Sequence, residues 1–219
     1  MSARITPPAT LPVFPIRGCI LLPGEALPLN VFEPRYLNMI DDVMAGEGWL
    51  GMVQPRATGP RERPDLEAVG TAGRVATFSE TGDGRYLIVV KGVTRFTLAG
   101  EAASQTPYRV AHADYTPYPH DAEPAAREAG ENERARFLAL LRRFFDHAGI
   151  EADWPSIERA PLNAITGKVA MACPFDPASK QALLEARDLP ERQRLLTGMM
   201  AAALDEAGSH SGGRQDRLH

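Results

Sequence analysis

Hydrophobic and polar positions divide the chain into two halves with different periods. Before about residue 118, glycine and proline interrupt short apolar runs roughly every eight to twelve positions, which is typical of a small antiparallel barrel or sandwich. Beyond about residue 120 the apolar spacing lengthens to that of helices. In the first half we expect strands at about 11–16, 27–32, 49–54, 70–79, 85–91, 93–100 and 108–115.

Two glycines shape the centre of this β-rich half. Asp83-Gly84 lies between two strand-like runs and favours the positive φ angles of a tight turn, so TFSETGDGRYLIVV is predicted to be a β-hairpin. Gly92 then marks a bend or bulge between RYLIVVK and VTRFTL.

One helix is expected among the strands. Pro34 suits the first helical position, where no backbone donor is needed, and a stripe of apolar side chains follows it at helical spacing. The stripe comprises Tyr36, Leu37, Ile40, Val43 and Met44. Residues 55–68 are polar and interrupted by proline, so we interpret them as a mobile excursion between strands.

The second half is predicted to be a helical bundle. Apolar stripes indicate helices at 131–148 and 161–173, a third from Asp176-Pro177 to about Arg187, and a last one from about Pro190. From Gly208 the tail has almost no apolar content and is expected to be disordered. The predicted organisation is a barrel subdomain at 8–118, a bundle subdomain at 123–207 and a tail at 208–219.

Composition limits the classes of function. The chain has 219 residues, 44% of them hydrophobic, with 24 basic and 28 acidic side chains and a net charge of −4. No apolar stretch approaches the roughly 20 residues that cross a bilayer, and the first ten residues lack the apolar centre of a secretory signal. We therefore expect a cytoplasmic protein without a membrane partner. The acidic balance also disfavours nucleic acid, which usually requires clustered positive charge.

Motifs of catalysis are missing from the sequence. It contains no G-x-x-x-x-G-K-[ST] loop, no G-x-G-x-x-G after a predicted strand and no H-E-x-x-H. Ser179 and Lys180 are adjacent, but neighbouring side chains on a helix diverge by about 100°, so we interpret them as an ordinary helix start. Cys19 and Cys173 have no C-x-x-C spacing and are interpreted as buried small hydrophobes. We expect no enzymatic activity, no cofactor and no metal.

Apolar side chains in loops offer a candidate binding surface. Ile20, Leu21 and Leu22 lie between Arg17-Gly18 and Pro23-Gly24, which are turn residues at both ends of the segment. Two interpretations stand: a buried staple that fastens the loop, or an apolar patch that docks a partner or an unfolded segment. Trp49, between Gly48 and Gly51, allows the same two interpretations.

Four segments in this order resemble the N-terminal substrate-binding domain of the Lon protease family. They are LPVFPI, LLPGEALPLNVFEPRY, GDGRYLIVVKGVTRF and KQALLEARDLPERQRLL, and the likeness covers roughly residues 10–206. The most specific matches are Pro28 to Tyr36 and the segment that contains Gly92, Arg95 and Phe96. The family's ATPase and Ser-Lys peptidase modules have no counterpart in this sequence.

The resemblance implies an α+β fold: an N-terminal six-stranded PUA-like pseudo-β-barrel, related to ASCH folds, with one or two short helices, followed by a C-terminal helical bundle. It also implies a non-catalytic module that captures unfolded or tagged protein segments, with a protease or chaperone as a further partner. Self-association is compatible with the sequence. An incompletely closed barrel can accept an extended peptide at a strand edge.

The pentapeptide Phe32-Glu33-Pro34-Arg35-Tyr36 is interpreted as structural. Phe32 is expected to end a strand and point into the barrel, and Tyr36 to begin the buried helical face. Glu33 and Arg35 flank the proline and are expected to hold a loop, with Arg95 as a candidate partner for Glu33.

Two other classes of function remain open at this point. PUA-type barrels include RNA readers, although the charge balance argues against that role. A small-molecule or enzymatic cleft is the other alternative, and it predicts a deep pocket that gathers Arg35, Arg95 or His112 with a carboxylate.

Overall fold

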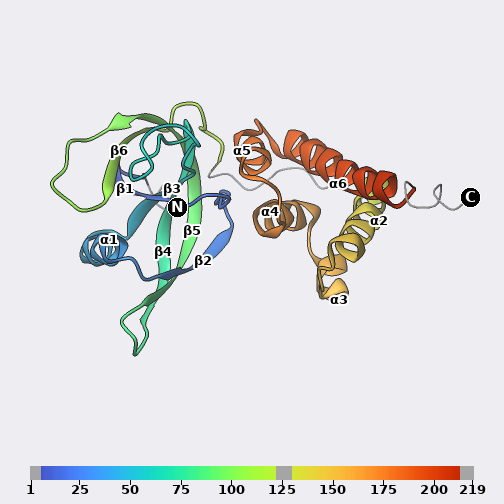
Figure 1. The fold of residues 1–219 in the computed structure, drawn as a ribbon, viewed down its shortest axis with the longest axis horizontal. Helices are drawn as coiled ribbons and strands as arrows, with labels where there is room; N and C mark the ends of the chain where they lie inside the picture. The colour runs from blue at the N-terminus through green and yellow to red at the C-terminus, as the bar shows by residue number, and fades with distance from the viewer. Residues whose placement is uncertain (1–5, 122–129, 213–219) are drawn as a thin grey trace, which may run out of the picture. The chain divides into compact units, whose positions relative to one another are not determined.

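The computed structural model of the chain, in which residues 6–121 and 130–212 are described, has two compact units (Figure 1). The first contains Met1–Pro124 with Cys173–Glu185, and the second contains Ala125–Ala172 with Ala186–His219. The segment 173–185 therefore groups with the barrel, whereas the sequence assigned it to the bundle at 123–207. The predicted start of that bundle, residue 123, lies outside the described residues.

Six strands and one helix form most of the first unit, as the resemblance implied. The β-rich part comprises β1 (Thr10–Pro15), β2 (Ala26–Val31), α1 (Pro34–Ala45), β3 (Trp49–Val53), β4 (Val69–Glu80), β5 (Tyr86–Glu101) and β6 (Arg109–Asp114). The sheet order is β2-β5-β4-β3-β1-β6, and β5 also pairs with β6. Only the β1–β3 pair is parallel among these pairings.

Strand β5 closes the barrel by changing its neighbour along its length. Its first part pairs with β2 from Tyr86 to Lys91, and its last part pairs with β6 from Thr97 to Glu101. The opposite edge of β5 pairs with β4 from Tyr86 to Thr97. A closed ring of five strands results, with β2 attached outside it beside the projecting β4–β5 hairpin (Figure 1).

The predicted hairpin and bulge are both confirmed. Gly84 has a φ of 78° in the turn, and Thr81 and Arg85 are linked through their backbones. The expected strands 85–91 and 93–100 are one continuous strand, β5, because Gly92 and Thr94 pair with adjacent residues of β4 and leave Val93 as an extra residue. A bulge of this kind increases strand twist, which helps a sheet to close.

Loop 17–26 packs onto the barrel beside this bulge. Its residues Ile20, Leu21 and Leu22 are at most 2% exposed, and Thr71 Oγ1 donates a hydrogen bond to the Leu21 carbonyl at 2.5 Å. A Cβ atom on Gly92 would lie 2.3 Å from the Leu22 carbonyl oxygen. Gly92 is therefore required by the close approach of the loop backbone.

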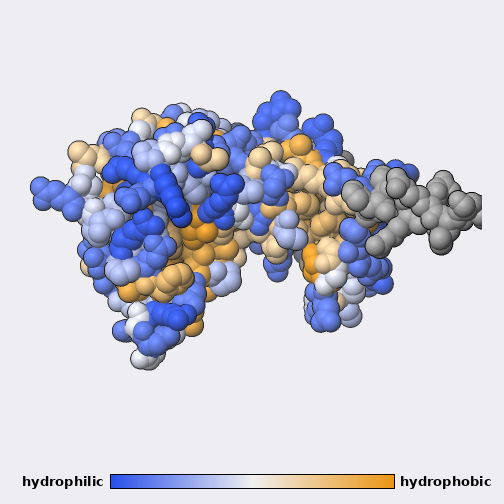
Figure 2. Space-filling model, viewed as in Figure 1, coloured by the Kyte–Doolittle hydropathy of each residue, from blue (hydrophilic) through white to orange (hydrophobic). Residues whose placement is uncertain are grey.

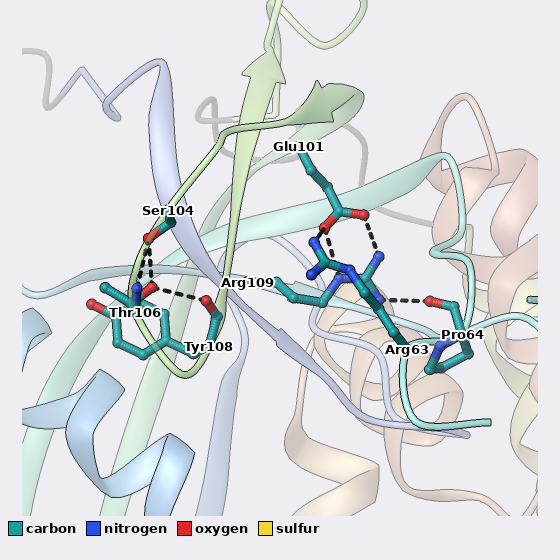
Figure 3. A network of polar contacts seen from close by, with 7 residues as sticks. All are labelled: Arg63, Pro64, Glu101, Ser104, Thr106, Tyr108 and Arg109. Atoms are coloured by element: carbon teal, nitrogen blue, oxygen red, sulfur yellow. Dashed lines mark hydrogen bonds and ion pairs between the residues drawn. The ribbon is translucent and has the colours of Figure 1, made fainter. Parts of the chain in front are cut away.

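Segment 55–68 is held to the barrel by specific contacts. Pro55 and Leu66 form a β-bridge, and Leu66 is buried. Figure 3 shows Glu101 between two arginines: Arg63 donates to its carboxylate at 2.7 Å, and Arg109 donates to it at 2.9 Å and to the Pro64 carbonyl at 2.6 Å. These bonds hold the pKa of Glu101 below its usual value, with the Arg109 hydrogen bond as the main cause.

Helix α1 begins at Pro34, as predicted, and covers one side of the barrel. Tyr36 is buried and its ring centroid lies 4.4 Å from that of Phe14. Tyr86 and Tyr108 donate hydrogen bonds to Asp41 and Asp42 of α1, at 2.9 and 2.6 Å. Burial, followed by the bond to Asp42, raises the pKa of Tyr108 to about 12. The buried face uses Met39 in place of the predicted Met44, which is 44% exposed.

Two predictions about the Phe32–Tyr36 segment are wrong. Phe32 was expected to point into the barrel, but it is 62% exposed, because β2 ends at Val31 and Val31 takes the buried position. Arg95 was named as a candidate partner for Glu33. Glu33 instead accepts hydrogen bonds from its near neighbour Arg35 at the surface, since Arg95 is committed to Asp121 in the interior.

Arg95 joins three segments of the first unit. It donates from Nε and Nη2 to the Asp121 carboxylate at 2.8 and 2.7 Å, and from Nη1 to the Leu184 carbonyl of α5 (Pro177–Glu185) at 3.0 Å. The Tyr118 ring lies 4.4 Å from its guanidinium carbon. Arg95 is 4% exposed, so this pair is shielded from solvent.

Buried amides complete the attachment of α5 to the barrel. Gln54 Nε2 donates to the Pro177 carbonyl and to Gln181 Oε1, both at 3.0 Å, and Gln181 Nε2 donates to the Val69 carbonyl at 3.1 Å. Since unpaired buried amides are costly, this network fixes one orientation of α5 on the strands.

The second unit is helical. It contains α2 (Glu131–Ala148), α3 (Trp154–Arg159), α4 (Leu162–Ala172) and α6 (Leu189–Gly212), of which α3 was not predicted. Helix α6 continues to Gly212, so the tail expected to be disordered from Gly208 is helical at its start, and residues 213–219 lie outside the described part. No helix in the described residues has the length and apolar character required to cross a membrane.

Replacing Arg95 by alanine is expected to destabilise the first unit by about 3 to 5 kcal/mol, because Asp121 keeps a buried charge without its counterion. The matched control is Arg35→Ala, which breaks an exposed pair worth about 0 to 1 kcal/mol. Urea unfolding followed by Trp49 fluorescence in a Trp154→Phe background measures this unit. Equal free energies of unfolding for the two variants would contradict the role of Arg95 as the buried counterion of Asp121.

Gly92→Ala is expected to destabilise the same unit by about 1 to 3 kcal/mol or more, since the new methyl group collides with the loop backbone. Gly82→Ala is the control, because a Cβ atom there meets nothing within 4 Å, and we expect a change within about 0.5 kcal/mol. The same urea assay measures the free energy of unfolding of both variants. If Gly92→Ala is as stable as Gly82→Ala, loop 17–26 does not contact this position closely.

Candidate binding edge and groove

Strand β2 presents a free edge with a defined set of backbone groups. Gly92 N donates to the Glu25 carbonyl at 2.9 Å, so residues 25 and 92 are a hydrogen-bonded pair. Pairs of this type alternate along an antiparallel ladder, and Leu27, Leu29 and Val31 therefore bond to β5. The backbone groups of Ala26, Pro28 and Asn30 consequently point away from β5.

No other strand of the described residues pairs with this edge, and Ala26, Pro28 and Asn30 are all exposed. Because proline lacks an N–H group, the edge offers two donors, from Ala26 and Asn30, and three carbonyl acceptors. This is the hydrogen-bonding pattern that an added antiparallel or parallel strand requires. Proline on an edge also limits uncontrolled pairing between chains.

A shallow groove of about 420 Å³ lies on the sheet next to this edge. Its lining comes from β2, β4 and β5 and consists of Pro28, Leu29, Asn30, Thr77, Phe78, Ser79, Leu87, Ile88 and Val89. None of these side chains titrates, and the polar ones are hydroxyls and an amide. The groove can hold apolar side chains and lacks an acid or a base of its own.

Three of the four large exposed apolar side chains in the described residues line this groove or directly follow β2. The four are Phe32, Met44, Phe78 and Leu87, with exposures of 40 to 62%. Phe78 and Leu87 line the groove, and Phe32 directly follows β2. Figure 2 shows apolar colour over β2 and the neighbouring parts of β4 and β5.

Charged groups stand at both ends of the groove. At the end near the barrel, the exposed Lys91 pairs in register with Arg74, whose guanidinium donates to the Glu47 carbonyl at 2.7 and 3.0 Å. At the hairpin tip, Asp83 accepts a hydrogen bond from Thr81 and pairs with Arg85 at 3.0 Å. The Thr81 bond, together with Arg85, lowers the pKa of Asp83. Asp83 therefore stays ionised at neutral pH.

The four residues predicted to bind a partner are buried. Ile20, Leu21 and Leu22 fasten loop 17–26 to the barrel, and Trp49 is 5% exposed in the barrel core with the Arg74 guanidinium carbon 5.6 Å from its ring. Their positions match the buried-staple interpretation and do not form an exposed patch. A role for these four in binding stays a prediction.

The residues expected in a deep pocket have separate partners. Arg35 pairs with Glu33, Arg95 with Asp121, and His112 lies 3.2 Å from Thr10 across the β1–β6 pair. None of the three lines the β2 groove. Cys173 is buried as expected and burial raises the pKa of its thiol to about 11, while Cys19 is only partly buried.

Sequence reasoning overlooked the β2 edge, although two features of the sequence indicate it. Proline within a strand is confined to edges and bulges, and Pro28 lies in the middle of ALPLNV. In the same segment, small or polar residues alternate with leucine and valine, which is typical of a strand with one face exposed.

Comparison with known proteins places the chain among Lon protease sequences. Residues 10–202 match the family described as the ATP-dependent protease La (LON) substrate-binding domain. Lon protease 2 of Sorangium cellulosum (strain So ce56) is 32% identical over 214 residues, covering 91% of this chain and 26% of that protein. Lon protease 4 of the same organism is 30% identical over 212 residues, covering 92% and 25%. The chain thus spans about a quarter of these relatives.

Solved structures of Lon N-terminal domains share the fold. The N-terminal domain of Mycobacterium avium complex Lon protease has a TM-score of 0.62 at 21% identity and covers 88% of this chain and 98% of that one. The Lon N-terminal domain protein from Xanthomonas campestris has a TM-score of 0.59 at 22% identity, with coverage of 88% and 97%. The α+β architecture derived from the sequence is confirmed by these neighbours.

Proposed function

Since the chain belongs to the family of LON substrate-binding domains, we propose that it is a non-catalytic module that binds extended polypeptide segments at the β2 edge and its groove. The observation that carries the proposal is the row of outward backbone groups on Ala26, Pro28 and Asn30 beside an apolar groove without titratable side chains. Full-length relatives combine this domain with other parts, and their proteolysis is not assigned to this chain.

Strand addition explains how the module can accept many sequences. Backbone hydrogen bonds from an added strand do not depend on the side chains of the bound segment. Selectivity comes from alternate side chains, which face the groove beside Leu87 and Val89 while their neighbours face solvent. The proposal therefore favours segments with apolar residues at every second position, which become available in unfolded proteins.

Binding at this edge is expected to be weak and reversible. The groove is shallow, Pro28 removes one donor, and interfaces below about 1,200 Å² are usually transient. Weak binding suits a module that must release the bound segment to a further partner, such as a protease or a chaperone.

Asn30→Pro is expected to weaken peptide binding at least tenfold, about 1.4 kcal/mol, because it removes an outward N–H without breaking a bond between β2 and β5. Asn30→Ala is the matched control, since it removes the side chain and keeps the N–H. Fluorescence anisotropy of a labelled peptide with alternating valine and threonine residues provides the measurement. Equal affinities of the two variants would exclude strand addition at Asn30.

Leu87→Asp is expected to weaken the same peptide about tenfold or more, because a carboxylate in the groove must lose water when an apolar side chain packs against it. Met44→Asp is the control, as Met44 is similarly exposed but lies on α1 and does not line the groove. Both variants are checked for folding by circular dichroism. If Met44→Asp reduces affinity as much as Leu87→Asp does, the apolar contact is not localised in the groove.

A further inference from the structure

The charges at the two ends of the β2 groove differ. At the end where β2 begins, Lys91 and Arg74 are opposite each other on neighbouring strands, and both are cations. At the hairpin tip, the Arg85 guanidinium is matched by the Asp83 carboxylate at 3.0 Å. The charges of that pair cancel, whereas two positive charges lie together at the other end.

Lys91 is the more mobile of these two cations. Arg74 is held by its two hydrogen bonds to the Glu47 carbonyl and by the ring of Trp49. Lys91 is exposed, and within residues 6–121 and 130–212 no ion pair or side-chain hydrogen bond engages its ammonium group. A lysine ammonium is a compact charge on a flexible stem. It is therefore available to a carboxylate that a bound segment brings.

Lys91 lies beside the free edge of β2. It pairs in register with Ala26, and this pair is not hydrogen-bonded because the preceding pair, Glu25 with Gly92, is. Side chains approach most closely in pairs of that type, and the methyl group of Ala26 leaves room above the strand. By alternation, Ala26 and Lys91 share the face of Val89, whereas Glu25 faces the opposite side of the sheet.

The free edge also ends at Ala26. The preceding residues form a turn, in which Gly24 has a φ of 83° and Glu25 N donates to the Leu22 carbonyl at 3.1 Å. A ladder on the β2 edge cannot continue past this turn. The last residue that an added strand pairs with β2 is therefore the one opposite Ala26, next to Lys91.

Strand direction decides which end of the bound segment lies there. Antiparallel ladders are slightly more stable per residue than parallel ones. Because β2 runs away from Lys91, an antiparallel strand runs toward it, and the carboxyl end of its ladder lies opposite Ala26. A parallel strand would instead place its amino end beside two cations. The charge at this end therefore favours the antiparallel direction.

On the basis of the proposed strand addition, we propose that the β2 edge selects extended segments that run antiparallel to β2 and carry a carboxylate at the residue opposite Ala26, where Lys91 binds it. A chain end or an acidic side chain supplies the same chemistry. Since the pair lies near the surface, it contributes about two- to fivefold in affinity and is weakened by salt. It fixes the direction of the segment, and the ladder and the groove supply most of the affinity.

Fluorescence anisotropy with the alternating valine and threonine peptide, labelled at its amino end, tests this selection. Three forms are compared: a free terminal carboxylate, a terminal carboxamide, and a carboxamide whose last residue is glutamate. The wild-type chain is expected to bind the first, the third or both about two- to fivefold more tightly than the second, which tells a chain end from an acidic side chain. Lys91→Met is expected to bind all three equally. Equal affinities for the wild-type chain, or a preference that Lys91→Met keeps, would overturn the proposal.

Two control variants locate the effect. Arg85→Met removes a cation at the hairpin tip and is expected to keep the preference for a carboxylate. Asn30→Pro is expected to weaken all three peptides, because it acts on the ladder. If Asn30→Pro weakens the peptides but the wild-type chain binds all three forms equally, only the role of Lys91 fails. If no form binds, or Asn30→Pro has no effect, strand addition fails as well.

A nitroxide at the amino end of the peptide tests the direction. In the complex it is expected to broaden the NMR signal of the Asn30 amide more than that of the Ala26 amide, because the amino end of an antiparallel strand lies at the Asn30 end of β2. Stronger broadening at Ala26 would show a parallel strand and overturn the proposal.

Discussion

The change of neighbour along β5 is the constraint on which the first unit depends. One edge of a strand can pair with only one neighbour at each point, so β2 and β6 must share β5 in sequence. The extra residue Val93 lies at the changeover, and the neighbouring Gly92 lets loop 17–26 pack closely. Because β6 closes the ring, β2 stays outside it with one edge unpaired by the other described strands. The candidate binding edge thus follows from how the barrel closes.

The contacts that stabilise this unit and the proposed binding edge lie in different parts of it. The interior is held by Arg95 with Asp121 and by the amides of Gln54 and Gln181, all of which have partners among buried groups. The β2 edge and the adjoining hairpin have exposed apolar side chains and free backbone groups instead. A rigid barrel can therefore present an adaptable edge, and Pro28 limits the tendency of such an edge to pair without control.

Local features of the sequence predicted the local features of the fold. Asp83-Gly84 indicated the hairpin and Pro34 the start of α1, because each needs only a particular backbone conformation. Gly92 indicated the bulge, although it is glycine because the backbone of loop 17–26 approaches it closely. Predictions that depended on distant partners were less successful. Phe32 is exposed because the neighbouring Val31 takes the buried position, and Met44 is exposed because the buried face of α1 includes Met39 instead. The partner of Arg95 is 26 residues away in a polar segment. The attachment of α5 to the barrel uses Arg95 and the amides of Gln54 and Gln181, which leave no hydrophobic period in the sequence.

The candidate site also combines a feature that the sequence made visible with one that it did not. The apolar residues of loop 17–26 were noticed because they are large and close together, yet such residues are usually buried, as they are here. The β2 edge is defined by backbone groups of alternate residues, and the sequence indicates it only by the position of Pro28 and by the alternation of small or polar residues with leucine and valine in ALPLNV.

Hydrogen exchange of individual backbone amides, measured by NMR with and without a reduced and carboxymethylated protein that cannot refold, tests strand addition most directly. The account predicts that the amides of Ala26 and Asn30 become protected on binding, while those of Leu27 and Leu29, already bonded to β5, change little. Unchanged exchange at Ala26 and Asn30 in a saturated complex would contradict it.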